Sequence, residues 1–455
     1  MSISVSSVKP MRCAGRRLIS GLLRDPIEVL ETLSAEARGR IVELKLGPFT
    51  AYLATHPEHL KHILKGNSPN YVREGLLWQP MRRLLGDGIV TANGASWERS
   101  RKSMQPFFTR RHVTAIGGSV TRTIAEQVDL LHDDAQAGKP VDTLTEISRI
   151  LRVVFMRILC GDRISFDAAA RLAQSCDAAT ESIKARLLFP FMPNTIPLPG
   201  DRAFQRATRE IDDIIYPLMA ETEHRPGDDV ISALCHEPEV KTDEAARRKV
   251  RDNLINLIGA SLETSARNLT WVWPMLHKHP ALAGRVYDEI ARVVGDGPVT
   301  PEHVEQLTYL RAFLREVLRL YPSGWLFSRT AVMDDTIDGV RIQGGATMLL
   351  SPYLTHRLEE FWDDPLAFDP GRFAENAPRR APYSYVPFGV GPRSCIGEHL
   401  FMTSGMLTVA TILSKYRTEI REGATFTPAA GASLRMRESV ALTLLPLRDL
   451  SKGQD

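Results

Sequence analysis

The chain has 455 residues, of which 43% are hydrophobic and 24% are charged, and its formal net charge is +3. This composition is that of an ordinary soluble globular protein, and the charge is too small to argue for a nucleic-acid partner. No Pro/Gly/Ser-rich linker, low-complexity tract or internal repeat divides the chain, so we expect one large, mostly helical domain over 1–455.

The N-terminal residues 1–25 are basic and contain no long apolar run, so we expect them to be loosely ordered. A membrane span needs ~20 consecutive apolar residues, and we therefore expect neither a membrane anchor nor a secretory signal. The five cysteines show no paired spacing: Cys13, Cys160, Cys176, Cys235 and Cys395. An odd, sparse set is typical of a reducing compartment, which predicts a cytoplasmic protein.

Two short strands are predicted first, over 42–46 and 50–53, as a hairpin around Gly47-Pro48. A second small β region is predicted over 336–342 and 347–351, where glycines supply the turns. Helical periodicity covers most of the remainder: 56–66, 96–108, 117–133, 143–161, 165–188, 201–223, 243–278, 281–294, 301–320 and 398–415. The pattern predicts a mainly α fold with small β-sheets, of the α+β class.

The predicted helix over 243–277 would run roughly 50 Å at 1.5 Å per residue. One of its faces is apolar at both ends and polar for two turns between them: Val250, Leu254, Leu257 and Ile258, then Ser261, Thr264, Ser265 and Asn268, then Trp271, Val272 and Met275. A polar island between apolar turns is poorly explained as a solvated face. Its hydroxyl side chains can bond back to the helix and open it locally, which would make room for a bound dioxygen.

Two other pairs of residues share helix faces. Trp97 and Arg101 are four residues apart, and alone they are an ordinary packing or cation–π pair. Glu316 and Arg319 are three residues apart, and alone they are an ordinary surface salt bridge. His356 is predicted to be a structural histidine rather than a ligand.

The most informative segment is 388–397, Phe-Gly-Val-Gly-Pro-Arg-Ser-Cys-Ile-Gly. Its glycines let the chain curl so that backbone N–H groups point at the sulfur of Cys395, and Gly391 can take a left-handed turn. Gly397 allows close approach to a flat macrocycle and the start of a helix, whose positive end would lower the thiol pKa. These features predict a thiolate that holds a haem iron, with Arg393 suited to a haem propionate. The alternative is a small buried hydrophobe.

The spacing FxxGxRxCxG in this segment resembles the cytochrome P450 family of haem-thiolate monooxygenases. The resemblance extends from the 42–53 hairpin to the C-terminal loop. It implies the P450 fold, with the long central helix over the haem and the cysteine loop beneath it. It also implies that haem b is bound by Cys395, with Phe388, Arg393 and Gly397 at the cofactor.

Within this resemblance the segment 260–265 is similar to the family's oxygen-activation motif. Glu263 and Thr264 match the acid–alcohol pair that delivers protons to bound oxygen. Ser261 stands where the family usually has glycine, so the usual kink of this helix is in doubt.

The remaining motifs match positions around the haem. Trp97, Arg101 and Arg329 match residues that bind the haem propionates. Glu316, Arg319 and Arg372 match a structural triad that braces the meander beneath the haem and takes no part in catalysis.

The implied reaction inserts one oxygen atom from O2 into a C–H or C=C bond of a lipophilic molecule. Because the chain has no room for a flavin or iron–sulfur module, no fused reductase is expected. Electrons from NAD(P)H would come through a ferredoxin, or a flavodoxin, with its reductase. The protein is expected to be a monomer. The rival classes are a peroxide-using haem-thiolate peroxygenase or isomerase, and a non-catalytic haem-binding protein.

The substrate is predicted from apolar segments expected to line a pocket. The predicted contacts are Trp78, Leu257, Ala260, Ser261, Trp325 and Leu326, and the proline-rich stretch 189–199 is similar to an apolar lid. The stretches 76–94 and 320–329 resemble soluble bacterial terpene-oxidising members of the family. We therefore expect a terpenoid such as a sesquiterpene, with a fatty acid or polyketide-like molecule as the alternative.

Overall fold

The computed structural model describes residues 10–47, 49–183, 186, 192 and 195–447. By its internal contacts the chain divides into two compact units. The first holds the described residues of Met1–Val72, Ala125–Ile147 and Thr264–Asp455, and the second holds Arg73–Ile124 and Ser148–Glu263. The sequence predicts one domain because no linker separates these units: the chain passes between them once after Val72, at the end of a short strand, and otherwise within helices.

All strands of the described chain belong to the first unit. The largest sheet has the order β1 (Met11–Ala14), β2 (Val42–Leu46), β3 (Phe49–Ala54), β9 (Thr347–Leu350), β6 (Phe327–Ala331) and β4 (Tyr71–Val72). The predicted hairpin is β2–β3, in which Val42 pairs with Leu53. β1 pairs with β2 in parallel, and β3 pairs with β9 in parallel.

Three smaller sheets complete the strands of this unit. They are β10 (Tyr416–Ile420), β13 (Ala441–Pro446) and β5 (Val141–Asp142), then β11 (Pro428–Ala429) with β12 (Arg435–Met436), and β7 (Asp335–Ile337) with β8 (Val340–Ile342). The second predicted β region is therefore divided: β7 and β8 form a hairpin of their own, whereas β9 joins the large sheet.

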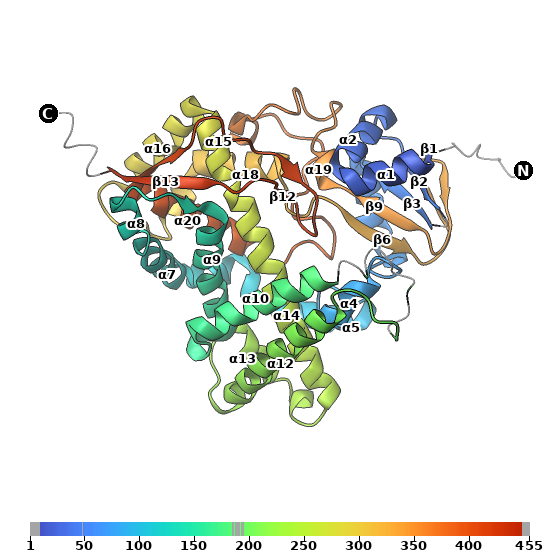
Figure 1. Cartoon of the computed structure of the whole chain (residues 1–455), viewed down its shortest axis with the longest axis horizontal. Coiled ribbons are helices and arrows are strands. Elements are labelled where there is room, and N and C mark those ends of the chain that lie inside the picture. The colour runs from blue at the N-terminus through green and yellow to red at the C-terminus, as the bar shows by residue number, and fades with distance from the viewer. Residues whose placement is uncertain (1–9, 48, 184–185, 187–191, 193–194, 448–455) are drawn as a thin grey trace, which may run out of the picture. The chain divides into compact units, whose positions relative to one another are not determined.

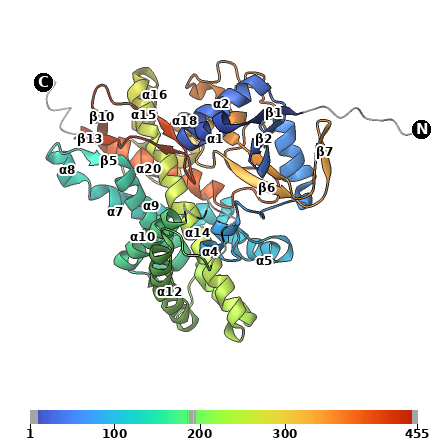
Figure 2. The ribbon, with the colours of Figure 1, turned by 45° about the vertical axis from the view of Figure 1, so that its right-hand side comes forward.

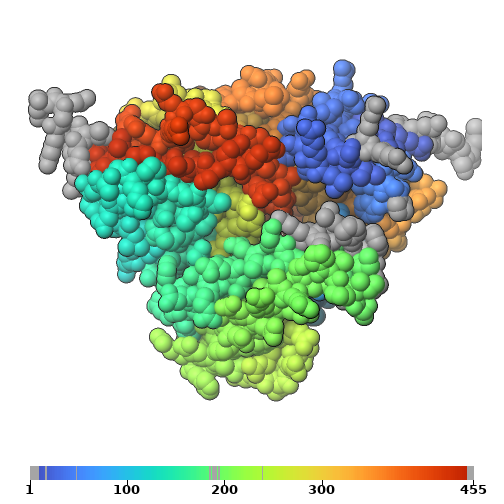
Figure 3. Space-filling model, in the orientation of Figure 1, coloured from blue at the N-terminus to red at the C-terminus, as the bar shows by residue number. Residues whose placement is uncertain are grey.

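The helices that lie wholly in the first unit are α1 (Arg16–Arg24), α2 (Pro26–Ala37), α3 (Pro57–Lys61), α8 (His132–Gln136), α15 (Val272–Lys278), α16 (Pro280–Val294), α17 (His303–Gln306), α18 (Thr308–Leu320), α19 (Pro352–Thr355) and α20 (Glu398–Lys415). α1 and α2 lie along the large sheet (Figures 1 and 2), where Leu18 and Leu30 pack with Val42 and Leu53 in one core cluster. C-terminal and N-terminal segments meet at the surface of this unit (Figure 3), where Arg437 Nη2 lies 3.0 Å from Asp25 Oδ2.

The described part of the second unit is helical. Its helices are α4 (Gln79–Leu85), α5 (Gly94–Met104), α6 (Arg110–Ala115), α10 (Phe166–Ser182), α12 (Asp201–His224) and α13 (Val230–Cys235). Three helices cross from one unit to the other: α7 (Gly117–Asp129), α9 (Thr143–Cys160) and α14 (Glu244–Thr270). Among the described residues, no helix is long and apolar enough to cross a membrane.

The structure corrects two predictions about continuity. The described part of 1–25 is not loosely ordered, because residues 11–24 form β1 and α1 and Leu18 is buried. The helix predicted over 243–278 ends at Thr270 and resumes as α15. Pro274 explains the break, since proline has no N–H to bond the Thr270 carbonyl and its ring clashes with that group in a continuous helix.

Candidate active site

The loop before α20 holds Cys395 in a tight turn. Gly391 has φ 76°, and a Cβ at this position would lie 1.9 Å from the Leu64 carbonyl oxygen. Only glycine fits such an approach of one backbone to another. The Cys395 N–H donates to the Phe388 carbonyl at 2.8 Å, and α20 begins three residues later at Glu398. The loop is therefore a closed, glycine-dependent turn at the N-terminus of a long helix.

Exposure distinguishes Cys395 from the other cysteines. Cys160, Cys176 and Cys235 are buried, and burial raises the pKa of each thiol to about 12. Those three side chains remain protonated thiols at neutral pH and are poor ligands. Cys395 is exposed on its loop. Of these four cysteines, Cys395 is the one whose sulfur is accessible to a metal in a bound group.

Two arginines of the same unit test whether an anionic cofactor fits here. Arg329 in β6 is only 4% exposed, and burial together with repulsion from Arg393 lowers its pKa to about 9. Its Nη1 donates to the Ser328 carbonyl at 2.8 Å, and no carboxylate of the described chain pairs with it. A buried guanidinium that has no carboxylate partner in the described chain and lies near a second guanidinium favours an anion beside it. The propionates of a haem held by Cys395 fit this requirement.

The predicted partners Trp97 and Arg101 belong to the second unit. Both lie on α5, four residues apart and half-buried. Phe388 is half-buried, with its ring 5.8 Å from that of Phe401 in α20. A Cβ at Gly397 would meet Cys395 Sγ at 3.9 Å, which is ordinary contact, so the chain itself does not require glycine at this position.

The centre of α14 is more accessible than the turns beside it. Residues 251–258 and 265–266 are buried, whereas Ala260 is exposed and Ser261, Glu263 and Thr264 are half-buried. Ser261 Oγ donates to the Ile258 carbonyl at 3.3 Å, within its own helix. α14 nevertheless stays helical from Glu244 to Thr270, so the local opening predicted from these hydroxyls is not a break in the helix. The division between the units falls between Glu263 and Thr264.

The structure brings Glu316, Arg319 and Arg372 together. Arg319 donates two hydrogen bonds to the Glu316 carboxylate, at 2.7 and 2.8 Å, and Arg372 Nε lies 3.5 Å from it. Arg319 and Glu316 are fully buried, and Arg319 also donates to the carbonyls of His356, Pro365 and Ala367. The cluster therefore fixes the segment 356–372 to α18.

His356 lies beside this cluster and is fully buried. Its Nδ1 lies 3.0 Å from the Arg319 carbonyl, and its Nε2 accepts a hydrogen bond from Val386 N–H at 2.8 Å. Burial lowers its pKa to about 3, so the ring is neutral. Because both ring nitrogens are bonded to the backbone, the prediction of a structural histidine is confirmed.

Comparison with known proteins decides the family. The family model for Cytochrome P450 matches residues 21–440. The chain belongs to the cytochrome P450 family. A crystal structure of the cytochrome P450DA heme domain shares the fold, with a TM-score of 0.85 and 19% sequence identity over 97% of this chain and 98% of that one.

Two curated relatives come from Streptomyces. Pentalenene oxygenase from Streptomyces avermitilis is 28% identical over 91% of this chain and 91% of its own length. Cyclooctatin synthase from Streptomyces melanosporofaciens is 29% identical over 96% of this chain and 92% of its own length. The chain is accordingly a P450 monooxygenase, and its family implies a haem cofactor.

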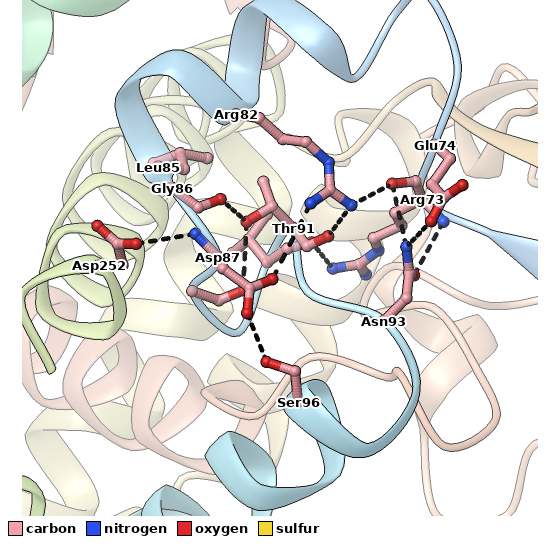
Figure 4. Close-up of polar contacts among 12 residues, drawn as sticks. Arg73, Glu74, Arg82, Leu85, Gly86, Asp87, Thr91, Asn93, Ser96 and Asp252 are labelled. Atoms are coloured by element: carbon pink, nitrogen blue, oxygen red, sulfur yellow. Dashed lines mark hydrogen bonds and ion pairs between the residues drawn. The ribbon is translucent and has the colours of Figure 1, made fainter. Parts of the chain in front are cut away.

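The P450 structure also contains polar contacts that the sequence analysis misses, between α14 and the loop 85–93 of the same unit (Figure 4). Three α14 side chains accept hydrogen bonds from the loop backbone: Asp252 from Asp87 N–H at 2.9 Å, Asn253 from Ile89 N–H at 2.9 Å, and Asn256 from Val90 N–H at 2.8 Å. Asn256 Nδ2 also donates to the Leu85 carbonyl at 2.7 Å. We call these three side chains the loop clamp.

The loop clamp leaves no room for a side chain at two glycine positions, and it also forms a hydrogen bond to α5. A Cβ at Gly86 would lie 1.9 Å from Asp252 Oδ2, and one at Gly88 would lie 2.2 Å from Asn256 Nδ2. Asn253 Nδ2 donates to Ser100 Oγ at 3.2 Å, which ties the clamp to α5. The clamp therefore sets the place of Trp97 and Arg101 on α5 relative to the first half of α14. The sequence holds one signal for the clamp. Asp and Asn are disfavoured inside helices, so three of them close together in one helix indicate that their side chains bind something else, and all three are buried.

The residues predicted to contact substrate lie in different surroundings. Trp78 is half-buried, with the Arg73 guanidinium 5.6 Å from its ring centre, and Leu257 is buried. Trp325 is 4% exposed in a core cluster, and its Nε1 donates to the Gly431 carbonyl at 3.1 Å. Both its ring and its N–H are engaged in these contacts, and its contact with substrate stays a prediction. Leu326 is half-buried against the same cluster.

Of the predicted lid over 189–199, residues 189–191 and 193–194 lie outside the described residues. Within the stretch 189–199, Ile196 is an exposed apolar side chain.

Proposed function

We propose that this P450 transfers one oxygen atom from O2 to a lipophilic terpenoid, with electrons supplied by an external ferredoxin or flavodoxin and its reductase. The observation that carries the chemistry is the exposed Cys395 in its glycine-dependent turn, in the same unit as the buried Arg329. A bound haem would supply O2 activation, and a thiolate ligand favours O–O cleavage.

The reaction balances with two electrons and two protons. A substrate R–H, O2, two electrons and two protons give R–OH and water, so one oxygen atom enters a C–H bond and the other leaves as water. NAD(P)H provides the electrons indirectly. Glu263 and Thr264 are proposed to hold and pass the two protons; both are half-buried on α14. Cys395 would hold the iron, and Arg329, Arg393, Trp97 and Arg101 would hold the propionates.

The terpenoid substrate is supported by the relatives rather than by the shape of a pocket. Pentalenene oxygenase, cyclooctatin synthase and cyclooctat-9-en-7-ol 5-monooxygenase each match about nine-tenths of this chain, with 28–29% identity. The sequence stretches 76–94 and 320–329 resemble the same group. We propose a cyclic sesquiterpene or a related terpene as the substrate class.

Turnover with isotopically labelled dioxygen tests this proposal. Purified protein would be supplied with NADPH, a ferredoxin and its reductase, under ¹⁸O2, with separate panels of sesquiterpenes, diterpenes and long-chain fatty acids. We expect a terpene product that carries one labelled oxygen atom. Labelled products from fatty acids alone would contradict the substrate class. Turnover with hydrogen peroxide but none with the reductase system would contradict the electron source.

A further inference from the structure

Ser323 is a buried residue that joins α14 to the chain after α18. It is 3% exposed, and all three of its polar groups are bonded. Its Oγ–H donates to the Thr264 carbonyl at 2.8 Å, and its backbone N–H donates to Asn268 Oδ1 at 3.0 Å. Its own carbonyl accepts from Leu434 N–H at 2.9 Å. One residue thus links the α14 turn of Thr264 to the C-terminal loop.

The chain around Ser323 contacts the C-terminal part of α14 and the residue that follows this helix. Thr264 and Asn268 are four residues apart on one face of α14, and Trp271 comes directly after its last residue, Thr270. The Trp271 ring stacks on Tyr321, with the ring centres 3.8 Å apart and the planes 1° from parallel. Ser323 is therefore held against α14 by an aromatic stack at one end and by its own hydrogen bonds at the other.

We propose that Ser323 is a positioning residue that sets the geometry of Thr264 for proton delivery and couples it to substrate occupancy. The inference rests on the proposed function, in which Thr264 passes protons. A carbonyl oxygen has two lone pairs, so the Thr264 carbonyl accepts the Ser323 hydroxyl without giving up its place in the helix. This bond fixes the peptide plane that follows Thr264, and with it the direction of the Thr264 side chain.

The coupling to substrate follows from what else the Ser323 segment holds. Trp325 Nε1 donates to the Gly431 carbonyl, and Leu434 N–H donates to the Ser323 carbonyl. Trp325 and Leu326 are predicted substrate contacts, and Gly431 and Leu434 belong to the C-terminal segment that bonds to Trp325 and Ser323. A substrate that presses on either segment shifts Ser323, and Ser323 transmits the shift to the Thr264 turn through a single hydrogen bond.

The consequence concerns the use of electrons. In productive turnover, O2, two electrons, two protons and R–H give R–OH and water. In unproductive turnover, O2, two electrons and two protons give H2O2, and the substrate is recovered. If the hydroxyl of Ser323 is removed, the Thr264 turn loses its anchor while Cys395 and the arginines are untouched. Misplacement of a group that must deliver a proton lowers the productive fraction.

The test compares Ser323→Ala with Ser323→Thr and with Ser351→Ala as the matched control. Ser351 is also fully buried, and its Oγ donates to the Trp325 carbonyl at 2.6 Å, so it matches Ser323 in burial and in its bond to a backbone carbonyl but makes no bond to Thr264. All proteins would first be shown to keep the red-shifted Soret band of the reduced CO complex. The measurements are product and H2O2 formed per NADPH, and the solvent deuterium isotope effect on product formation.

We expect Ser323→Ala to lower product per NADPH by about fivefold to tenfold, the factor that corresponds to one ordinary hydrogen bond, with a matching rise in H2O2. The solvent isotope effect should change as well, Ser323→Thr should restore both, and Ser351→Ala should leave both near the wild-type values. Adding Ser323→Ala to Thr264→Ala should cause no further loss, because both changes act on one group.

Wild-type coupling in Ser323→Ala, equal uncoupling in Ser351→Ala, or additive losses in the double variant would each overturn the inference. Should Ser323→Ala fail to fold, Ser323→Cys keeps the volume with a weaker donor and should give an intermediate loss. A wild-type protein that lacks the red-shifted band would instead refute the proposed function, so the two failures are distinguishable.

Discussion

At the scale of single residues, Gly389 and Gly391 show two different reasons for glycine in the cysteine loop: backbone conformation and close contact with another backbone segment. Both have positive φ, 67° and 76°. A Cβ at Gly389 meets nothing within 4 Å, whereas one at Gly391 meets the Leu64 carbonyl oxygen at 1.9 Å. Glycine is favoured at position 389 only because the turn is left-handed. At position 391 it is also required because the backbone at Leu64 lies so close.

We therefore predict that Gly389→Ala lowers the free energy of unfolding by about 1 kcal/mol, the cost of a left-handed non-glycine residue. Gly391→Ala should cost about 3 kcal/mol or more, because steric overlap is added. Urea unfolding followed by haem absorbance would measure both. Gly391→Ala should also shift the reduced CO complex away from the red-shifted Soret band, and equal costs for the two variants would contradict this account of the loop.

Much of the cysteine loop could be predicted from residues, because its chemistry is local. The left-handed turn at Gly391 and the start of α20 after Gly397 both follow from the order of residue types. The burial of Trp325 could not be predicted in this way. Whether an aromatic side chain lines a cavity or fills a core depends on segments far away in the sequence, here on Gly431 and the α2 side of the large sheet.

At the scale of elements, the long helices could be predicted from the sequence, but the break in the helix predicted over 243–278 could not. α12, α16 and α20 lie within a residue or two of the predicted ranges, because each holds several full periods of apolar residues. Short helices such as α4 and α19 hold only about one or two periods. The parallel pairings β1–β2 and β3–β9 join chain segments that have no shared turn, so no local signal predicts them.

The loop clamp gives the prediction at this scale. Asn256→Ala leaves the N–H of Val90 and the carbonyl of Leu85 without their α14 partner, and Asn256 is fully buried. We predict a loss of about 2–4 kcal/mol in the free energy of unfolding, since each buried polar group left unpaired costs about 1–3 kcal/mol. Hydrogen exchange should accelerate at the amides of 87–90.

Arg248→Ala is the control on the same helix. The Arg248 side chain is 69% exposed and forms an i,i+4 pair with Glu244 at 3.6 Å, so its loss should change stability by less than about 0.5 kcal/mol. Unchanged protection of the loop amides in Asn256→Ala would show that the clamp does not hold the loop.

At the scale of the whole molecule, the fold followed from the family resemblance rather than from composition. Composition predicted a globular, mostly helical chain, which many folds satisfy. The motifs around Cys395, Glu316 and Glu263 narrowed this to one family, and the family model and the structural likeness bear it out. The division into two units could not be predicted, because three of its crossings lie within α7, α9 and α14 and the fourth directly follows β4 at Val72, with no linker-like composition.

The central claim is that Cys395 supplies the thiolate to a bound haem. The most direct measurement is the absorption spectrum of the purified protein after reduction and exposure to CO, for the wild type and for Cys395→Ala. We predict the strongly red-shifted Soret band of a thiolate-ligated haem in the wild type and its loss in Cys395→Ala. A wild-type protein that stays colourless after expression with ample haem precursor, or a variant that keeps the red-shifted band, would contradict the claim.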